Sequence, residues 1–304
     1  MSKPQLKHTI PMWTHTFSKD ELSLSDCDAN EEILIPSLYS LFQNVAFMDV
    51  ERLPSLTREN LEAKGLAWMI AENSCRLLPH RVYSPAELIS ETWSPGLKGV
   101  YFIRNSACWR EKRTWPGLFA LASAKWFLVN KKERKIVRPD EVIGMEELSL
   151  TKHDWQEMQF PTKRLPSLLK EINQPASYDF FMERSVEYSY IDLNSHLNNT
   201  HYLAFALDCL ARYLKEQDLN PWNYKVRELH TNYSSEVFAW QTLRIYLKEQ
   251  AYQSSNDLEG NSILHNFRLG DKVRSFLLEG LNLDTNRSAF KQEIVVEEAS
   301  ANNA

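Results

Sequence analysis

Apolar residues recur along the first half of the chain at two spacings, one typical of strands and one typical of a helix. Between residues 12 and 24, polar and apolar side chains alternate, which predicts a half-buried strand. The next run, SLYSLFQNVAFMDVERL, predicts a long helix, and Pro36 suits its first turn because the nitrogen there needs no helical hydrogen bond. Its apolar residues lie at Leu38, Leu41, Phe42, Val45 and Leu53.

Four strand-like runs follow this helix, separated by short segments that contain proline and glycine. They are LAWMIAENSCRLL, AELISETWS, GVYFIRNSACWRE and LFALASAKWFLVN. Segments such as SPG and TWPG predict turns between them. The pattern of the first half therefore predicts one long helix followed by an antiparallel meander.

The second half repeats this order of elements. ERSVEYSYIDLNSHLNN is expected to be extended and to lead into a helix over THYLAFALDCLARYLKEQ. The apolar face of that helix carries Leu203, Ala206, Leu207, Leu210 and Leu214. Four more runs predict strands, namely VRELHTNYSSEV, WQTLRIYLKEQ, ILHNFRLG and VRSFLLEGLNL.

Three positions of the first half also correspond to three positions of the second half. Aligning the first pair sets an offset of 164 residues, and the other two pairs follow from it. The pairs are Asp28 and Asp192, Asn30 and Asn194, and Glu32 and His196. So long an offset indicates tandem homologous domains rather than a solenoid. We expect an α+β fold, a tandem double hotdog in which each half is a long central helix wrapped by a curled antiparallel β-sheet. The domains are predicted at residues 1–147 and 183–304, with an interdomain linker at 148–182 and a disordered tail from about residue 290.

Composition and charge narrow the classes of function. The net charge of −5 and the pI near 6.0 disfavour a nucleic-acid partner, because such partners usually require a basic face. The four cysteines show neither metal-ligand spacing nor a disulfide framework, the glycines form no phosphate-binding loop, and no apolar run is long enough to span a membrane. We therefore expect a cytoplasmic protein with reduced thiols, no cofactor and no metal.

The stretch YIDLNSHLNNTHY holds an unusual density of small polar groups. Asp192, Asn194 and His196 are two residues apart, so an extended chain would turn all three to one side. Histidine can transfer protons near neutral pH, asparagine can donate hydrogen bonds to an oxyanion, and aspartate can orient either group. The alternative is structural: Asp192 and Asn194 build an Asx-turn, Asn198 or Asn199 caps the helix, and His196 is merely exposed.

DLNSHLNNTHYL is similar to the DxNxHxNN(x)xY(I/L) signature of the plant and bacterial acyl-ACP thioesterases, double-hotdog enzymes that act on thioesters of acyl carrier protein (ACP). Other runs resemble the same family, namely IPSLYSLFQNVAF, GLAWMIAENSCRLL, SETWSPGLKGVYFIRN, ASAKWFLVNKKERKIVRP and TNYSSEV. The resemblance extends from about residue 12 to about residue 283.

This resemblance implies roles for four residues. Asp192 would position the site, Asn194 would help hold the thioester carbonyl or its oxyanion, and His196 would take part in proton transfer or polarisation. Glu236, the glutamate of NYSSE, would activate a water molecule. Plant members carry a cysteine directly after this glutamate, whereas this chain has Val237, and no GxSxG elbow supplies a serine. Water is then the nucleophile that remains.

By the same analogy, the first domain has lost catalysis and houses the acyl chain, since it has Glu32 where the histidine would stand. Candidate chain-binding residues are Leu66, Trp68, Met69, Phe102 and Trp126. Each of these side chains could equally be part of an ordinary core.

The activity that the resemblance implies is hydrolysis of fatty acyl-ACP to free fatty acid, which terminates fatty acid synthesis. An acyl-CoA thioesterase of hotdog type and a non-catalytic acyl-carrier-binding protein are the alternatives. Because ACP is strongly acidic, its docking requires a basic patch, although a basic turn can also be simply solvated. The candidates are Lys112, Arg113, Lys131, Lys132, Arg134, Lys135 and Arg138. Tandem hotdogs already supply the pairing that single ones obtain by dimerising, so monomer and homodimer both stay open.

Overall fold

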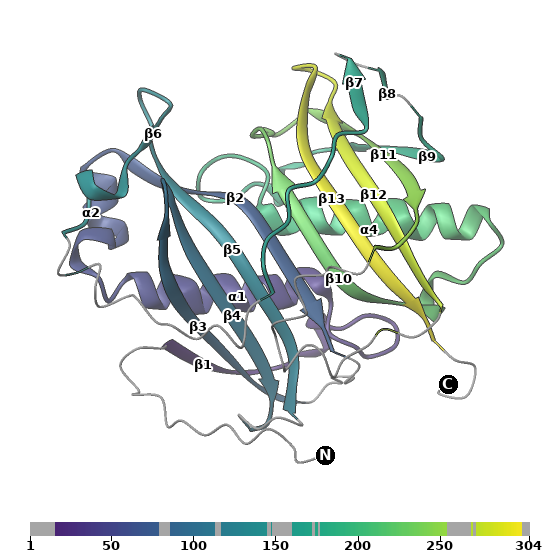
Figure 1. Cartoon of the computed structure of the whole chain (residues 1–304), viewed down its shortest axis with the longest axis horizontal. Coiled ribbons are helices and arrows are strands. Elements are labelled where there is room, and N and C mark those ends of the chain that lie inside the picture. The colour runs from purple at the N-terminus through teal and green to yellow at the C-terminus, as the bar shows by residue number, and fades with distance from the viewer. Residues whose placement is uncertain are drawn as a thin grey trace. The chain divides into compact units, whose positions relative to one another are not determined.

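Contacts along the chain divide it into two units, each of which combines an antiparallel sheet with few helices (Figure 1). The computed structural model describes residues 16–78, 86–112, 117–144, 147, 160–171, 174–175, 177–253, 269 and 272–299. The first unit comprises residues 1–34, 38–162 and 256–268, and the second comprises residues 35–37, 163–255 and 269–304. The coarse expectation of an α+β fold is therefore confirmed for both units.

The sheet of the first unit has the strand order β1-β3-β4-β5-β2, with the short β6 added to β5, and its neighbouring strands are antiparallel. The strands are β1 (Thr16–Glu21), β2 (Leu66–Leu77), β3 (Glu87–Lys98), β4 (Tyr101–Arg110), β5 (Leu118–Asn130) and β6 (Lys135–Val137). The helices are α1 (Ile35–Val50), α2 (Arg58–Ala63) and the 3-10 turns η1 (Leu24–Asp26), η2 (Pro54–Leu56) and η4 (Pro139–Glu141).

Helix α1 follows the predicted apolar period. Leu38, Phe42 and Val45 are buried on it, and Pro36 stands in its first turn as expected. Beyond its last turn, the chain adds a cluster of buried apolar side chains to the unit. This cluster contains Leu53, Leu56, Leu61, Leu66, Leu128, Val142 and Ile143.

Strand β3 is longer than predicted. The sequence predicts a turn at SPG, but Ser94, Pro95 and Gly96 lie inside β3. A bulge between Trp93 and Gly96 interrupts the regular pairing with β4, and bulges are among the few places in a sheet that tolerate proline. The turn comes at Gly99 instead, where a φ of 64° falls in the left-handed region that glycine adopts without strain.

The sheet of the second unit has the strand order β10-β13-β12-β11-β9, again with antiparallel neighbours. Its strands are β9 (Phe180–Ser185), β10 (Tyr224–Tyr233), β11 (Thr242–Gln250), β12 (Val273–Asn282) and β13 (Arg287–Glu298). The short strands β7 (Leu169–Glu171) and β8 (Gln174–Pro175) form a separate pair. The expected strand ILHNFRLG and the expected turn TWPG fall almost entirely outside the described residues.

Helix α4 (Asn199–Glu216) contacts strands β9 and β11 of this sheet, and 3-10 turns η6 (Tyr188–Tyr190) and η7 (Pro221–Asn223) stand on either side of it in the chain. It buries the predicted apolar residues Leu203, Ala206, Leu210 and Leu214. No helix in the described part of the chain combines the length and the hydrophobicity that crossing a membrane requires.

Strand β13 corrects the prediction of a disordered tail from about residue 290. Residues 287–298 pair with both β10 and β12, and only the last few residues lie outside the described part. The glutamates suggested a solvated tail, yet Glu293 is buried because Lys163, Gln250 and Ser275 contact its carboxylate. Phe290, Ile294, Val295 and Val296 supply the apolar burial of this strand.

Residues 163–169, here called the strap, lie on the sheet of the second unit. Leu165 and Leu168 of the strap are buried against Tyr246, Leu277 and Leu281. The described part of the predicted linker after Thr162 therefore belongs to the second unit.

The carboxylate of Glu279, which is 1% exposed, fixes the strap to β12. It accepts hydrogen bonds from the Leu168 amide at 2.6 Å, the Leu169 amide at 3.1 Å and the Ser167 hydroxyl at 2.8 Å. The Ser288 hydroxyl donates to it from β13 at 2.7 Å. Four donors thus offset the cost of burying this charge.

The two units repeat their first elements at the predicted offset. Shifting β1, η1 and the start of α1 by 164 residues, the separation of Asp28 from Asp192, places them on β9, η6 and the start of α4. The agreement covers the bounds of three successive elements, which supports the internal duplication inferred from the sequence.

Candidate active site

The segment between η6 and α4 is a tight turn rather than an extended chain. The Asp192 amide donates to the His196 carbonyl oxygen at 2.9 Å, and the Ser195 amide donates to the Asp192 carbonyl oxygen at 3.0 Å. Ser195 has a φ of 66°, and an isolated bridge joins Ile191 to Leu197. The expectation that alternation along an extended chain aligns the polar side chains is therefore wrong; the fold of the turn decides which of them meet.

The same turn occurs in the first unit. The Asp28 amide donates to the Glu32 carbonyl oxygen at 2.8 Å, and the Glu31 amide donates to the Asp28 carbonyl oxygen at 2.9 Å. Glu31 has a φ of 63°, and Cys27 bridges to Ile33. The backbone of the duplicated loop is thus common to both units, whereas its last side chain is Glu32 in the first unit and His196 in the second.

The turn brings His196 between two carboxylates. Its Nδ1 atom lies 3.6 Å from Asp192 Oδ1, and its Nε2 atom lies 3.8 Å from Glu236 Oε1. The three side chains are 15%, 20% and 15% exposed, so the site is partly shielded but reachable from solvent. The Leu197 amide donates to the Val237 carbonyl oxygen at 2.7 Å, which ties the segment carrying Glu236 to the turn. The two distances from the His196 nitrogens to the carboxylates are longer than a hydrogen bond, and such distances can shorten when substrate binds.

Asn194 and Asn198 take the local roles of the structural alternative. The Asn194 amide donates to Asp192 Oδ1 at 2.7 Å, which makes the Asx-turn, and the Asn194 side chain is exposed. The Asn198 side chain accepts from the Thr200 amide at 2.9 Å and caps α4. His196, however, is largely buried between two carboxylates, so the structural roles of the asparagines are compatible with a chemical role for the histidine. A role for Asn194 at the oxyanion stays a prediction.

Tyr202 stands at the tyrosine of the family signature, although the sequence predicted no role for it. It lies in the first turn of α4, is 4% exposed and packs edge-on against the rings of Tyr233 and Phe290. Burial raises the pKa of its hydroxyl, and the carboxylates of Glu236 and Asp192 raise it further. The spacing of Tyr202 in the helix is that of any core residue, so the sequence did not show which residues surround it.

The cysteines are poorly suited to act as nucleophiles. All four are free thiols, and Cys75, Cys108 and Cys209 are buried. Burial raises the pKa of Cys209 to about 12, so its reactive thiolate form is scarce at neutral pH. Val237, at the position where plant members have cysteine, is fully buried. Among the described residues, no group of His, Cys, Asp and Glu could hold a metal ion.

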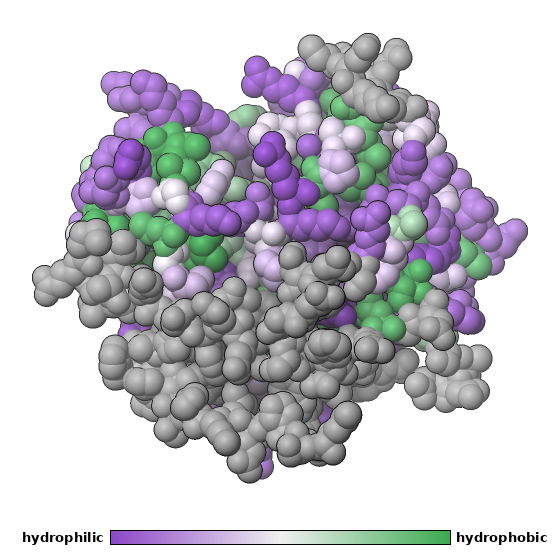
Figure 2. All heavy atoms as spheres, in the orientation of Figure 1, coloured by the Kyte–Doolittle hydropathy of each residue, from purple (hydrophilic) through white to green (hydrophobic). Residues whose placement is uncertain are grey.

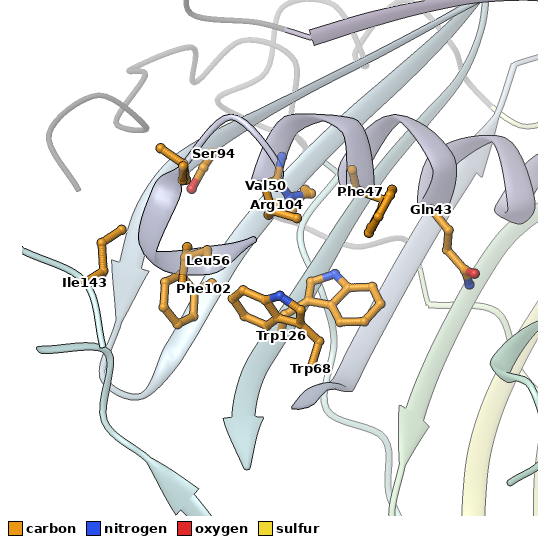
Figure 3. A pocket seen from close by; sticks show the side chains of 12 residues that line it. Gln43, Phe47, Val50, Leu56, Trp68, Ser94, Phe102, Arg104, Trp126 and Ile143 are labelled. Carbon is orange, nitrogen blue, oxygen red and sulfur yellow. The ribbon is translucent and has the colours of Figure 1, made fainter. Parts of the chain in front are cut away.

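The first unit contains an apolar pocket of about 170 Å³ beside α1. Its volume is comparable to the roughly 150 Å³ of a cavity that holds benzene, so it can take a stretch of hydrocarbon. Figure 3 shows Trp68 and Trp126 next to each other, with Phe47 and Val50 of the helix close by. The lining residues are Gln43, Ala46, Phe47, Val50, Leu53, Leu56, Trp68, Ser94, Phe102, Arg104, Trp126 and Ile143.

Three of the five predicted chain-binding residues, Trp68, Phe102 and Trp126, line this pocket. Leu66 instead belongs to the buried cluster of the first unit, and Met69 is not among the lining residues. Helix α1 contributes further lining residues, among them Phe47, that the sequence prediction did not name. Phe47 is exposed, and nothing in the sequence pattern indicated that it borders a pocket.

The predicted basic patch is exposed. Lys131, Lys132, Arg134 and Lys135 lie at the turn between β5 and β6, and where Figure 1 draws this turn, at the upper left, Figure 2 shows a hydrophilic surface. Lys112 is also exposed. Lys135 and Arg138 lie 3.5 Å and 3.1 Å from the carboxylates of Glu133 and Asp140, respectively. Arg113 lies outside the described residues.

Comparison with family models identifies the family of this chain. Residues 15–145 match the model of the acyl-ACP thioesterase N-terminal domain, and residues 173–276 match the model of the acyl-ACP thioesterase C-terminal domain. The chain belongs to the acyl-ACP thioesterase family. The resemblance inferred from its motifs is confirmed. No curated protein sequence matches the chain.

Solved structures of acyl-ACP thioesterases share the fold along nearly the whole chain. A 12:0-ACP thioesterase from Umbellularia californica has a TM-score of 0.72 at 13% identity, covering 94% of this chain and 94% of that chain. An acyl-ACP thioesterase from Bacteroides thetaiotaomicron has a TM-score of 0.69 at 15% identity, covering 93% and 98%. A putative oleoyl thioesterase from Lactobacillus plantarum has a TM-score of 0.69 at 15% identity, covering 94% and 97%.

Proposed function

We propose that the protein hydrolyses the thioester of fatty acyl-ACP and releases free fatty acid and ACP, a reaction that terminates fatty acid synthesis. Membership of the acyl-ACP thioesterase family supports the reaction class. The observation that carries the proposal is the placement of His196 between Asp192 and Glu236. We also propose that the two α+β units are the two halves of a double hotdog, which the shared turn and the repeated element bounds support.

The proposed mechanism uses water as the nucleophile. The Glu236 carboxylate removes a proton from water, and the water oxygen attacks the carbonyl carbon of the thioester. The carbon–sulfur bond then breaks, and His196 supplies a proton to the departing thiolate, while Asp192 keeps the imidazole oriented. Buried Cys209 and the valine at position 237 leave no cysteine to act in place of water at this site.

The apolar pocket of the first unit is the proposed site for the acyl chain. Trp68, Phe102 and Trp126 form an apolar wall, and burying each methylene of a hydrocarbon chain contributes about 0.8 kcal/mol. Arg104 also lines the pocket, and its charge is balanced by the partly buried Asp49, whose Oδ2 atom lies 2.6 Å from Arg104 Nη1.

The proposed partner is ACP, and the exposed basic turn after β5 is the proposed contact for its acidic surface. The acyl-CoA alternative predicts a different substrate preference. Initial rates on acyl-ACP and acyl-CoA of equal chain length separate the two, and a clear preference for acyl-CoA would contradict the proposal of ACP as partner.

Replacing His196 or Glu236 by Ala is expected to lower kcat on acyl-ACP by about 10²–10⁴-fold, because each change removes a proton-transfer group. The matched control is Glu32→Ala, which alters the corresponding position of the same turn in the first unit. Its kcat should stay near that of the wild type. Wild-type turnover in both His196→Ala and Glu236→Ala would refute the site assignment.

A further inference from the structure

One charged side chain stands in the wall of the pocket proposed for the acyl chain. Among the described residues that line this pocket, Arg104 is the only charged one, and most of the others are aliphatic or aromatic. Figure 3 shows it together with Val50, Phe47 and the two tryptophans. A guanidinium group is an unusual neighbour for a plain hydrocarbon chain, because it carries a charge and several N–H donors.

The sheet places Arg104 next to the apolar part of the pocket. Phe102 and Arg104 are two residues apart on β4, so their side chains leave the same face of the strand. On the neighbouring strand β5, Trp126 pairs with Phe102, and Ala124 pairs with Arg104. Ala124 contributes only a methyl group beside the guanidinium, where a longer side chain could have covered it. The wall therefore changes from aromatic to charged between neighbouring positions of one face.

One nitrogen of Arg104 makes both of its hydrogen bonds to the described residues. Arg104 Nη1 donates to Asp49 Oδ2 at 2.6 Å and to Thr92 Oγ1 at 3.3 Å. The side chains of Arg104 and Asp49 are 11% and 13% exposed, so the pair is largely removed from water. Arg104 Nε and Nη2 donate to no acceptor within the described part of the chain. The charge is thus balanced, while part of the donor capacity is unused.

Two hydroxyl groups beside Arg104 are already engaged with the backbone. The Ser94 hydroxyl, which also lines the pocket, donates to the Ile103 carbonyl oxygen at 2.8 Å. The Thr92 hydroxyl donates to the Asn105 carbonyl oxygen at 2.9 Å. These protons serve the strands, so the N–H groups of Arg104 are the donors that a ligand in the pocket can use.

The chemistry of these donors decides which ligand suits the pocket. A hydrocarbon chain that covers an N–H group displaces water from it and offers no hydrogen bond in return, which is unfavourable. An oxygen atom on the chain restores the hydrogen bond, and a bond from a charged donor is roughly twice as strong as one between neutral groups.

We propose that the pocket prefers an acyl chain with an oxygen substituent, a hydroxyl or keto group, and that Arg104 donates a hydrogen bond to this oxygen through Nε or Nη2. The inference rests on the proposed acyl-chain site and names the class of its substrate. Phe102 and Trp126 contact the hydrocarbon on the adjoining apolar side. Arg104 determines specificity and takes no part in breaking the thioester.

The binding test needs no turnover. Medium-chain fatty acid methyl esters with a hydroxyl at each carbon in turn are titrated into the wild-type protein, and calorimetry gives the Kd of each isomer. These isomers contain the same amount of hydrocarbon, and they have no carboxylate that could pair with Arg104. The isomer whose hydroxyl reaches Arg104 should bind roughly tenfold or more tightly than the others, as expected for one hydrogen bond to a charged group.

Variants assign this preference to Arg104. Arg104→Met keeps a long side chain without the donors, and it should abolish the difference among the isomers. Arg52→Met is the matched control, because Arg52 Nη1 lies 3.4 Å from the other carboxylate oxygen of Asp49 but Arg52 is not among the lining residues. This control should keep the wild-type preference. If Arg104→Met does not fold, Arg104→Lys, which keeps the charge but moves the donors, should weaken the preference.

Acyl-ACP substrates made from the same isomers extend the test to turnover, and kcat/KM should be highest for the isomer that binds most tightly as its ester. If the wild type hydrolyses no acyl-ACP, the proposed function fails, and the Kd values alone decide the inference. The absence of a preferred isomer in the wild type would overturn it. So would an unchanged preference in Arg104→Met, or in Arg104→Lys where the methionine variant does not fold.

Discussion

Asp192 serves the backbone and the candidate site with one oxygen atom. Its Oδ1 atom accepts the Asn194 amide at 2.7 Å and lies 3.6 Å from His196 Nδ1. Asp28 in the first unit serves the backbone, accepting the Asn30 amide at 2.8 Å and the Glu32 amide at 3.0 Å. A comparison of the two aspartates therefore separates folding of the turn from chemistry.

Replacing either aspartate by Ala should lower the free energy of unfolding by about 1 kcal/mol, because each change removes the acceptor of the turn. Only Asp192→Ala should also lower kcat, by at least about tenfold, since His196 then loses the carboxylate that orients it. Steady-state rates and urea denaturation of both variants test this. An equal loss of kcat in Asp28→Ala would mean that the effect of Asp192→Ala is one of stability alone.

The residues of the candidate site were predictable from the sequence, but their arrangement was not. The motif and its downstream glutamate indicated Asp192, His196 and Glu236, and the turn brings these three together. An extended chain would also have brought the Asn194 side chain to the site, but this side chain is exposed in the structure. Tyr202 stands at the tyrosine of the signature, but it received no predicted role, because its helical spacing is equally that of a core residue.

At the scale of elements, periodicity located both long helices and most strands, and the failures have local causes. Proline and glycine at SPG mark a bulge inside β3 instead of its end. In β13, the buried carboxylate of Glu293 accepts hydrogen bonds from Lys163, Gln250 and Ser275. A segment rich in glutamate does not reveal that such donors are present. Both errors arise from contacts between segments far apart in the sequence.

Glu279 is expected to be essential for the strap. Replacing it by Ala leaves the buried amide of Leu168 and the partly buried amide of Leu169 without their acceptor, which should lower the free energy of unfolding by about 3 kcal/mol or more. Urea denaturation measures the loss. Glu183→Ala is the control, because Glu183 pairs with Arg244 at the surface and an exposed pair contributes at most about 1 kcal/mol. Similar losses in the two variants would contradict a special role for Glu279.

At the scale of the whole molecule, the chain carries two copies of one loop with different chemistry. The pocket lies in the unit with Glu32, and the three candidate catalytic side chains lie in the unit with His196. The sequence resemblance implied that the first domain binds the acyl chain and the second carries out catalysis, and this assignment remains a proposal. A partner as acidic as ACP adds a requirement for positive charge on a protein whose net charge is −5.

Reversing the charge of both Lys131 and Lys132 to Glu should raise KM for acyl-ACP by roughly tenfold at low salt and leave KM for acyl-CoA unchanged. The difference should shrink as salt is added, because salt screens exposed charges. Lys215→Glu, an exposed lysine of the second unit, is the control. Unchanged KM for acyl-ACP in the double variant would exclude the turn after β5 as the docking contact.

The strap also has a consequence in time. Ser167 and the glutamate that holds it are 112 residues apart, so the strap leaves the ribosome long before its anchor does. At roughly 5–20 residues per second, this interval lasts about 6 to 22 s. During it, Leu165 and Leu168 have no sheet to cover them, and they present apolar surface to other nascent chains and to chaperones. The second unit is therefore completed only after β12 and β13 have been synthesised and can pair.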